Sequence, residues 1–415
     1  MNIATLLSYW LPKRMNKLLA DADICVKCGL CLPTCPTYLK TENENESPRG
    51  RIALIQAWAG GHLEDSKAVR THIDNCLLCR ECERVCPAVV PYSQLVDNFR
   101  SQFFADKKSS VAASLLKEVA QHKTAQRLTQ ISLKLYQTTP LQKIARSLKL
   151  PKLVGLDKVE RLLSHYYEPT ELADYYPTTA ECKGTVGLFI GCMGTLLDFT
   201  TIEAAIKVLT AVGFNVAIPS QQTCCGALAL HNGDSASVEK SANINSEAFG
   251  NQPLTAIVTI ASGCGGQLQA YSQTEFADKV MDISQFLMQA DCHLSEKLKP
   301  LAASVCLHTP CSLKNVMRAE QGALQLLQQI PELKVTKLPK AIVCCGSAGS
   351  YMLEHAAMAE SILADLLDAA ATTQANYLIS SNIGCVLHIG AGLQERGITM
   401  EVLHPVVLIA RQLKQ

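Results

Sequence analysis

The sequence has no long apolar run, no excess of charge of either sign and few aromatic residues. No uninterrupted apolar stretch reaches the roughly 20 residues that a membrane-spanning helix needs. The formal net charge is +1, from 38 basic and 37 acidic residues, and only 5% of the residues are aromatic. No basic stretch interleaved with aromatics is present, so nucleic acid is not expected as a partner.

Two nucleotide-binding motifs are also missing. No G-x-G-x-x-G follows an expected strand, and there is no P-loop. A flavin or nicotinamide bound in the usual way is therefore not expected in this chain.

Cysteine, in contrast, is abundant, with 19 residues in a chain of 415. The count is odd, and much of it falls in metal-ligand spacings, which favours ligands over disulfides and predicts a reducing compartment. In the N-terminal stretch MNIATLLSYWLPKRMNKLL the apolar part precedes the basic part, the reverse of a secretory signal. We therefore expect a cytoplasmic chain, and this stretch is a candidate for lying on an anionic membrane surface.

Two N-terminal runs carry the most specific pattern. CVKCGLCLPTCP and CLLCRECERVCP both have the bacterial ferredoxin spacing C-x2-C-x2-C-x3-C-P. In such pairs the first three thiolates of a run hold one iron-sulfur cluster and the fourth ligates the other. The predicted ligands are Cys25, Cys28, Cys31 and Cys86 for one 4Fe-4S cluster, and Cys76, Cys79, Cys82 and Cys35 for the second.

The residues around these runs are expected to form loops and helices. Glu42, Glu44 and Glu46 are expected in a solvated loop, and Pro48 marks the start of a helix. The basic pair Arg49 and Arg51 is a candidate for raising the potential of a nearby cluster. Residues 88–178 lack cysteine and have helical spacing of apolar residues, so a structural helical bridge is expected there.

The second half contains a duplicated cysteine pattern. TCCGALALHNGD and VCCGSAGSYMLE lie 120 residues apart, and each double cysteine has one cysteine before it and one after it at matched distances. Self-similarity of this kind marks duplicated modules. The eight cysteines are candidate metal ligands or redox thiols: Cys192, Cys224, Cys225 and Cys264 in the first copy, and Cys311, Cys344, Cys345 and Cys385 in the second.

Strands and helices are expected to alternate in both copies. Strands are predicted at 185–192, 215–219 and 256–264 in the first copy and at 304–311, 334–338, 341–346 and 376–385 in the second, with helices at 201–214 and 322–330. This order predicts parallel sheets with helices on their faces, and a binding crevice at the carboxyl ends of the strands, where most of the cysteines fall. Cys182, Cys292 and Cys306 have no counterpart in the repeat and are expected in the core or on the surface.

The whole pattern resembles the iron-sulfur subunit of glycolate dehydrogenase, also called glycolate oxidase. SPRGRI, HTPC, CCGSAGSY and NIGC are the most particular matches. The chain is less closely similar to the C subunit of anaerobic glycerol-3-phosphate dehydrogenase, to iron-sulfur subunits of lactate dehydrogenases and to the B subunit of heterodisulfide reductase.

The resemblance implies an oxidoreductase complex. Separate FAD-binding subunits would oxidise a 2-hydroxy acid, and this chain would pass the electrons toward the quinone pool from the cytoplasmic face of the inner membrane. The implied fold is α+β and α/β: a helical two-cluster ferredoxin-type domain at 1–105, a helical bridge at 106–182, and two α/β cysteine-rich domains with parallel sheets at 183–300 and 301–415.

One departure from the heterodisulfide reductase pattern leaves the role of the cysteine-rich domains open. There the module ends in C-x2-C, whereas here the third position after Cys264 is Gln267 and the third after Cys385 is His388. Each copy therefore lacks a fifth thiolate. The open alternatives are a further iron-sulfur centre, with His388 as a substitute ligand, and a thiol/disulfide reductase site. His308, three residues before Cys311, is the candidate catalytic residue, because it lies close enough to protonate an acceptor or tune a thiolate.

Overall fold

The computed structural model describes residues 13–103, 110–163, 170–290, 292, 294–339 and 344–414. Within these ranges no helix combines the length and the apolar character that crossing a bilayer requires. The N-terminal apolar stretch with its membrane-surface interpretation lies mostly outside the described residues.

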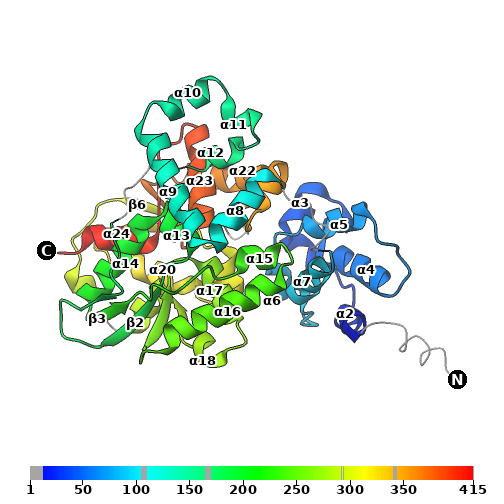
Figure 1. Cartoon of the computed structure of the whole chain (residues 1–415), viewed down its shortest axis with the longest axis horizontal. Coiled ribbons are helices and arrows are strands. Elements are labelled where there is room, and N and C mark those ends of the chain that lie inside the picture. The colour runs from blue at the N-terminus through cyan, green and yellow to red at the C-terminus, as the bar shows by residue number, and fades with distance from the viewer. Residues whose placement is uncertain are drawn as a thin grey trace.

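The N-terminal domain is built from short helices around two cysteine-bearing loops, as predicted (Figure 1). Its elements are α2 (Lys13–Asp23), η1 (Leu32–Thr34), α3 (Pro36–Thr41), η2 (Glu44–Glu46), α4 (Pro48–Ala59), α5 (Lys67–Asp74), α6 (Glu81–Arg84) and α7 (Tyr92–Gln102). Helix α4 begins at Pro48 because the Ser47 side chain accepts a hydrogen bond from the Gly50 amide, and proline is well suited to the first helical position. Buried apolar residues of α4 pack against α2 and α7.

The bridge is helical, as expected from its apolar spacing. It contains α8 (Val111–Gln121), α9 (Lys123–Thr138), α10 (Leu141–Ser147), α11 (Leu150–Leu153) and α12 (Asp157–Arg161). Helix α8 packs against the cysteine-rich modules, whereas α10 and α11 lie at the edge of the molecule (Figure 1).

The first cysteine-rich module contains a five-stranded sheet in the order β1-β3-β2-β4-β5. The strands are β1 (Tyr175–Tyr176), β2 (Gly184–Phe189), β3 (Phe214–Ala217), β4 (Ala256–Thr259) and β5 (Val280–Asp282). All neighbours are parallel except the edge strand β1, which runs antiparallel to β3 and comes from the segment assigned to the bridge. The helices are α13 (Cys192–Leu197), α14 (Phe199–Ala211), α15 (Ala227–His231), α16 (Ser235–Gly250), α17 (Ser262–Gln269), α18 (Thr274–Ala277), α19 (Ile283–Gln289) and η4 (Leu294–Lys297).

The second module contains an all-parallel sheet in the order β7-β6-β8-β9. The strands are β6 (Ser304–Leu307), β7 (Lys334–Lys337), β8 (Tyr377–Ile379) and β9 (Glu401–Leu403). The helical elements are η5 (Ser312–Val316), α20 (Glu320–Leu327), α21 (Tyr351–Glu354), α22 (Ala356–Thr372), α23 (Ile383–Glu395) and α24 (Pro405–Gln412). The exposed lysines at both ends of edge strand β7 discourage pairing with another sheet.

In both sheets the order of strand addition reverses, between β2 and β4 in the first and between β6 and β8 in the second, while these strands stay parallel. The chain leaves β2 for β3 on one side and returns to β4 on the other, and β6, β7 and β8 repeat this path. The point where the strand order reverses opens a crevice at the carboxyl ends of the strands. The observed strands are shorter than the predicted ones. They end before the repeat cysteines, and Cys192, Cys264 and Cys385 lie in the helices that follow. Of the segment 341–346 only Cys344–Gly346 is described, and it forms no strand.

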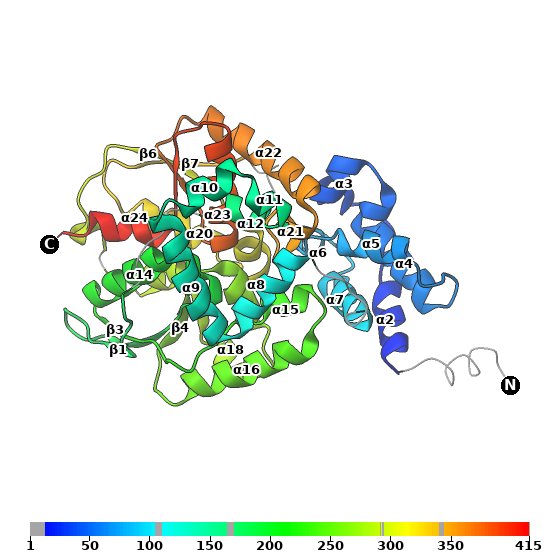
Figure 2. The ribbon, with the colours of Figure 1, turned by 45° about the horizontal axis from the view of Figure 1, so that its top comes forward.

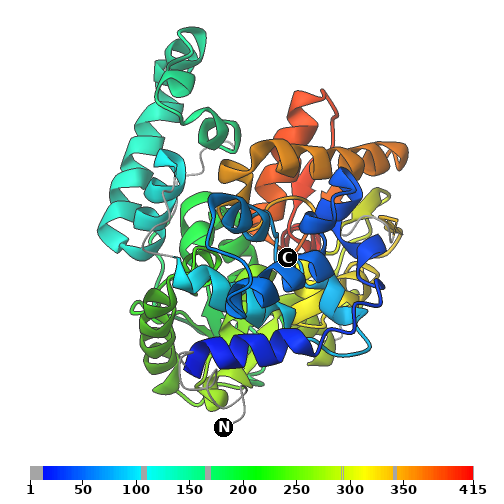
Figure 3. The same cartoon turned by 90° about the vertical axis from the view of Figure 1, so that its right-hand side faces the viewer.

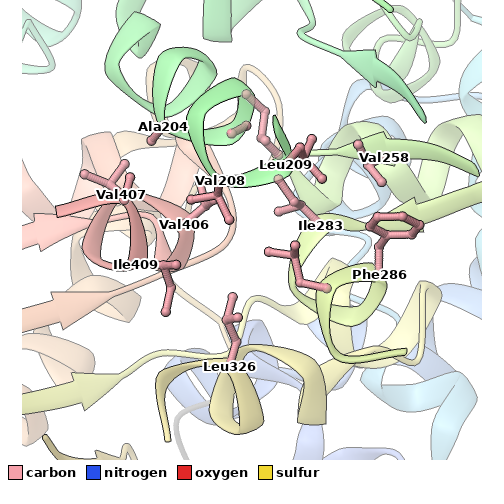
Figure 4. Close-up of a cluster of buried hydrophobic side chains, with 14 of the residues drawn as sticks. Ala204, Val208, Leu209, Val258, Ile283, Phe286, Leu326, Val406, Val407 and Ile409 are labelled. Carbon is pink, nitrogen blue, oxygen red and sulfur yellow. The ribbon is translucent and has the colours of Figure 1, made fainter. Parts of the chain in front are cut away.

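The two modules share a large hydrophobic core, and each also has a smaller apolar cluster of its own. Apolar side chains of α14, α19, α20 and α24 converge in the shared core, as Figure 4 shows. Helix α24, the last of the chain, packs against α14 of the first module. Figure 2 shows the N-terminal domain beside this body, with α3 next to α22 of the second module.

Candidate metal centres

The first cysteine run and the last cysteine of the second run line one cavity. Its walls include the four thiols predicted to share a cluster, Cys25, Cys28, Cys31 and Cys86, around about 450 Å³ of empty space. Cys82 also touches this cavity. The structure therefore places Cys86 with the first run although it belongs to the second run in sequence.

A second cavity adjoins the first, and Pro48, Cys82 and Tyr92 line both. Cys35, Cys76, Cys79 and Cys82 line it around about 320 Å³ of empty space. This set is the crosswise partner of the first: three cysteines of the second run and the fourth cysteine of the first.

The backbone of both loops fits an anionic cofactor. Lys27 and Gly29 in the first run and Leu78 and Arg80 in the second have left-handed backbone angles, at equivalent positions between the cysteines. Such interleaved turns direct backbone N–H groups into a concavity and are common at iron-sulfur sites. Four thiols, an apolar wall and inward amides are what a 4Fe-4S cluster requires, so the residues present fit the predicted cofactor.

A buried ion pair supports the second cavity. The Arg51 side chain is 1% exposed and donates hydrogen bonds to Glu46 Oε2 (2.5 Å), Thr37 Oγ1 (3.1 Å) and the His72 carbonyl oxygen (2.7 Å). The Cys35 thiol lies 3.3 Å from Thr37 Oγ1 and donates to the Glu46 carbonyl oxygen at 3.6 Å.

Glu46 corrects one expectation. The residue is 4% exposed rather than solvated, and its carboxylate also contacts His72 Nδ1 (2.7 Å) and Asn75 Nδ2 (2.9 Å). The reason is that buried Arg51 needs a counter-charge, which a loop residue five positions earlier supplies. Burial alone lowers the pKa of Arg51, but the electrostatic attraction of the acidic groups around it, Cys76, Cys35 and Glu46 among them, outweighs burial, so this pKa is raised.

Two further side chains hold the second loop in place, and sequence reasoning missed both. Tyr92 donates its hydroxyl to Cys76 Sγ at 3.4 Å. The buried Arg100 donates to the carbonyl oxygens of Ile73, Asp74 and Cys76. Neither residue belongs to the cysteine runs, and only the fold brings them there.

In the first cysteine-rich module the four repeat cysteines gather at the switch point between β2 and β4. Cys192 Sγ lies 3.6 Å from Cys224 Sγ, and hydrogen bonds with Cys192 and Cys225 hold the pKa of Cys224 well below its usual range. The carbonyl groups of Cys224 and Cys225 are fixed by Asn245 (3.2 Å) and by the Tyr271 hydroxyl (2.8 Å).

The second module repeats this arrangement. Cys345 Sγ lies 2.8 Å from Cys385 Sγ, and hydrogen bonds with Cys311 and Cys345 hold the pKa of Cys344 well below its usual range. In both modules the first cysteine of the pair is thus the one held closest to a thiolate, and the amide of the glycine that follows the pair donates to it.

A histidine distinguishes the second module from the first. His308, Cys345 and Cys385 are buried and have donor atoms within 4.8 Å of one another. Burial lowers the pKa of His308 to about 4, so the imidazole is neutral at pH 7, and its Nδ1 lies 2.9 Å from Ser380 Oγ. A neutral imidazole suits a metal ligand better than a proton donor at that pH. The residue at the equivalent position of the first module is Phe189.

His388 plays a different part from the one suggested by its place in the sequence. It lies on α23, is buried, and its Nδ1 donates to the Cys345 carbonyl oxygen at 3.0 Å. Burial lowers its pKa to about 4. The structure therefore brings His308 rather than His388 into the group of cysteines, because α23 turns the His388 ring toward the backbone.

The second cavity of the N-terminal domain adjoins the second module. Leu77 is buried against Cys344, and Cys79 and Cys311 pack on the same apolar cluster. Asn315 Nδ2 donates to the Cys79 carbonyl oxygen at 2.7 Å, and Lys314 Nζ pairs with the buried Glu81 at 3.0 Å. Sequence reasoning missed both η5 residues, since nothing local marks a contact between segments more than 230 residues apart.

The remaining cysteines lie outside these groups. Cys182 is exposed, and Cys292 and Cys306 are buried, in agreement with the expectation of surface or core positions. All nineteen cysteines fall in the described ranges, and each is a free thiol.

Comparison with known proteins agrees with this architecture. The 4Fe-4S dicluster domain family matches residues 21–90, and the cysteine-rich domain family matches residues 186–269 and 305–390. The chain is 31% identical to a probable glycolate oxidase iron-sulfur subunit of Bacillus subtilis, covering 91% of this chain and 90% of the relative.

Two further relatives widen the group. The glycolate oxidase iron-sulfur subunit of Escherichia coli is 29% identical over 91% of this chain and 93% of its own length. Lactate utilization protein A of Bacillus pumilus is 25% identical over 53% of this chain and 96% of its own length. The expected resemblance and fold class are thereby confirmed, and the chain belongs to the glycolate oxidase iron-sulfur subunit family.

Proposed function

We propose that this chain is the electron-transfer subunit of a flavin-dependent glycolate (2-hydroxy acid) dehydrogenase complex. It takes electrons from FAD-binding partner subunits and passes them toward the quinone pool. The observation that carries the proposal is the pair of adjoining cavities: the four cysteines of each predicted set line one of them, and Cys82 lines both. The names of the relatives support the choice of donor: two are glycolate oxidase subunits, and the lactate utilization protein makes lactate the alternative substrate.

When bound, the two 4Fe-4S clusters supply one-electron carriers. The residues of the chain hold and tune them. Eight thiolates, Cys25, Cys28, Cys31 and Cys86 in one set and Cys76, Cys79, Cys82 and Cys35 in the other, fix their positions, and Ile52, Val90 and Tyr92 form apolar or aromatic walls. Buried Arg51 places a positive charge beside Cys35 and Cys76, which favours the reduced, more negative state.

The contacts between domains suggest the direction of transfer. The cavity of Cys35, Cys76 and Cys79 adjoins the second cysteine-rich module, through Leu77 and Asn315. We therefore assign the cavity of Cys25 and Cys28, which is partly exposed, to the side of one redox partner. The second module, with His308, lies on the path toward the other. The division into domains at 1–105, 106–182, 183–300 and 301–415 and a peripheral position at the cytoplasmic face of the inner membrane belong to the same proposal.

The test is reconstitution of the complex under anaerobic conditions. The FAD-binding subunits should copurify with this chain and reduce a dye when glycolate is added. A Cys25→Ser/Cys76→Ser variant should still copurify. It should reduce an electron acceptor that draws electrons from the clusters no faster than the flavoprotein subunits alone do. Full activity without this chain would overturn the proposal, and a preference for lactate would change only the substrate.

A second candidate function concerns the second module, because His308 lies within 4.8 Å of Cys345 and Cys385. Nitrogen and sulfur donors together suit zinc or iron, whereas a thiol/disulfide reductase site needs no imidazole ligand. We propose a further metal centre there, with His308, Cys311, Cys344, Cys345 and Cys385 as the candidate donors.

Metal counting separates the two interpretations. Two 4Fe-4S clusters account for about eight irons per chain. Additional iron or zinc that His308→Gln removes, and that the matched first-module variant Phe189→Leu leaves in place, would support the metal centre. No metal beyond eight irons, together with disulfide reduction that Cys344→Ser abolishes, would favour the reductase instead.

A further inference from the structure

We propose that helices α9 to α12, residues 123–161, form an arm that docks on the surface of an anionic lipid bilayer. The arm was expected to be only a structural bridge. Its surface, charge and composition all depart from those of a helical bridge whose apolar side chains are buried.

The arm exposes an unusual number of large apolar side chains. On α9, Leu128 is 66% exposed, and Ile131 and Leu135 are each 55% exposed. The exposed set continues along α10, α11 and their connections: Leu141, Ile144, Leu148, Leu150, Leu153 and Val154. Leu153 alone is 77% exposed. Contiguous exposed apolar surface of this kind marks an interaction site.

The amphipathicity of α9 is reversed relative to the body of the molecule. Leu128, Ile131 and Leu135 follow one another at helical spacing on the outer face. The inner face is mixed: Leu133 and Tyr136 are half-buried there, Gln130 Nε2 donates to the Thr195 carbonyl oxygen at 3.1 Å, and Gln126 Nε2 donates to that of Ala120 at 3.4 Å. Helix α9 is thus held to the protein by polar as well as apolar contacts and presents a second, fully apolar stripe outward.

The arm is also strongly basic. Residues 123–161 contain nine Lys and Arg against two Asp and Glu, a formal net charge of +7 in a chain that carries +1 overall. Arg146 and Arg161 are paired with carboxylates. Arg127, Lys143, Lys149 and Lys152 make no ion pair within the described ranges. Exposed leucines among unpaired basic residues match an element that lies in the headgroup region of an anionic bilayer.

The composition favours lipid over a protein partner. Protein interfaces are enriched in aromatic residues and methionine and depleted in lysine. The exposed large apolar residues of the arm are all leucine, isoleucine or valine. Lysine is the commonest charged residue of the arm. Figure 1 shows α10 and α11 at the edge of the molecule, and in Figure 3 the top of the arm rises above the rest of the chain.

The inference rests on the proposed function for its purpose only, since a chain that delivers electrons to the quinone pool must approach the membrane. The docking surface itself needs no cluster and no partner. The test of the docking surface therefore measures binding of the chain to lipid vesicles. Cluster content and dye reduction are measured separately.

The experiment is flotation of the full-length chain, purified anaerobically, with vesicles of phosphatidylcholine alone or with about one-third phosphatidylglycerol. We expect binding to the anionic vesicles only, weakened by salt. Leu128→Gln/Ile131→Gln/Leu135→Gln should reduce the binding constant at least about tenfold, and Lys143→Gln/Lys149→Gln/Lys152→Gln roughly 100-fold. The control is Leu39→Gln, which changes a similarly exposed leucine of α3 and should bind like the wild type.

Equal binding of the wild type and both arm variants, or equal binding to neutral and anionic vesicles, would overturn the proposal. So would loss of the flavoprotein subunits from the leucine variant without any effect on vesicle binding, which would assign the arm to a protein partner. Glycolate-dependent dye reduction by the arm variants should equal that of the wild type. If dye reduction is absent even in the wild type while vesicle binding holds, the electron-transfer proposal fails and the docking surface stands.

Discussion

Cys35 and Cys86 are the two cysteines whose partners cannot be read from their neighbours along the chain. The structure places Cys86 beside Cys25, Cys28 and Cys31, and Cys35 beside Cys76, Cys79 and Cys82. The run spacing predicts this exchange because a three-residue gap and a proline carry the fourth thiol away from the loop formed by the first three. The assignment of the eight ligands stays a prediction, which metal analysis of variants can test.

Paired serine variants test the crosswise arrangement. Cys25→Ser/Cys86→Ser should lose about four irons per chain, as one cluster is lost, whereas Cys25→Ser/Cys35→Ser should lose about eight. Iron analysis and electron paramagnetic resonance of the anaerobically purified variants measure this. The control is Cys182→Ser, an exposed cysteine outside both cavities. If each run instead holds its own cluster, Cys25→Ser/Cys86→Ser would lose about eight irons and Cys25→Ser/Cys35→Ser about four, which would contradict the crosswise arrangement.

Glu46 shows where residue-level reasoning failed. Its neighbours Glu42 and Glu44 are exposed, and the stretch reads as a loop, yet Glu46 is buried against Arg51. The burial depends on where α4 places Arg51, which no local pattern reveals.

Glu46→Gln should destabilise the N-terminal domain by about 3–5 kcal/mol, because it leaves the buried Arg51 charge without its carboxylate partner. The loss of cluster absorbance against denaturant concentration measures the change. Glu44→Gln is the matched control, since the Glu44–Arg49 pair is at the surface and should contribute little. Equal midpoints for Glu46→Gln and Glu44→Gln would contradict the account.

At the scale of elements, periodicity predicted the alternation of strands and helices but not their ends. The predicted strand 185–192 ends at Phe189, and Cys192 opens α13. The reason is that strand and buried helix residues are both apolar, so a continuous apolar run hides the boundary. Cys192, Cys264 and Cys385 therefore sit in the first turns of helices rather than in the sheet.

Helix α24 provides a test of pH dependence. His404 caps it by accepting a hydrogen bond from the Val406 amide through Nδ1 at 3.1 Å, and burial lowers the pKa of His404 to about 3. Below pH 6.5 the unfolded chain binds a proton that the folded chain does not, so the free energy of unfolding falls as pH falls, by about 1.4 kcal/mol per pH unit.

His404→Asn keeps a capping side chain but cannot titrate. Between pH 6.5 and 4 the melting temperature of the wild type should fall more steeply than that of this variant. Thermal unfolding at several pH values measures the difference, and His62→Asn, at an exposed position, should follow the wild type. Parallel curves for the wild type and His404→Asn would show that His404 contributes nothing.

At the scale of the whole molecule, the repeat predicted two similar modules, and the structure adds that they are not equivalent. They share a large core, but it is the second module that contacts the Cys79 loop through Asn315 and carries His308 among its cysteines. Sequence alignment of the two copies would have revealed Phe189 opposite His308. It would not have revealed the contact with Cys79, which depends on how the domains pack.

Lys314→Met should loosen the N-terminal domain from the second module. Glu81 is 3% exposed and accepts from Lys314 as well as Arg84, so loss of the ammonium should cost about 1–3 kcal/mol. The expected result is a lower denaturant midpoint for loss of cluster absorbance, with Lys314→Arg retaining most of the stability. Wild-type behaviour of Lys314→Met would mean that this ion pair does not hold the domains together.

The central claim is that electrons from a 2-hydroxy acid enter the clusters held by this chain. The most direct measurement is electron paramagnetic resonance of the reconstituted complex, frozen anaerobically after glycolate is added without an acceptor. The account predicts signals of reduced 4Fe-4S clusters, lost in Cys25→Ser/Cys76→Ser. Clusters that dithionite reduces but that remain oxidised with glycolate and with lactate would contradict it.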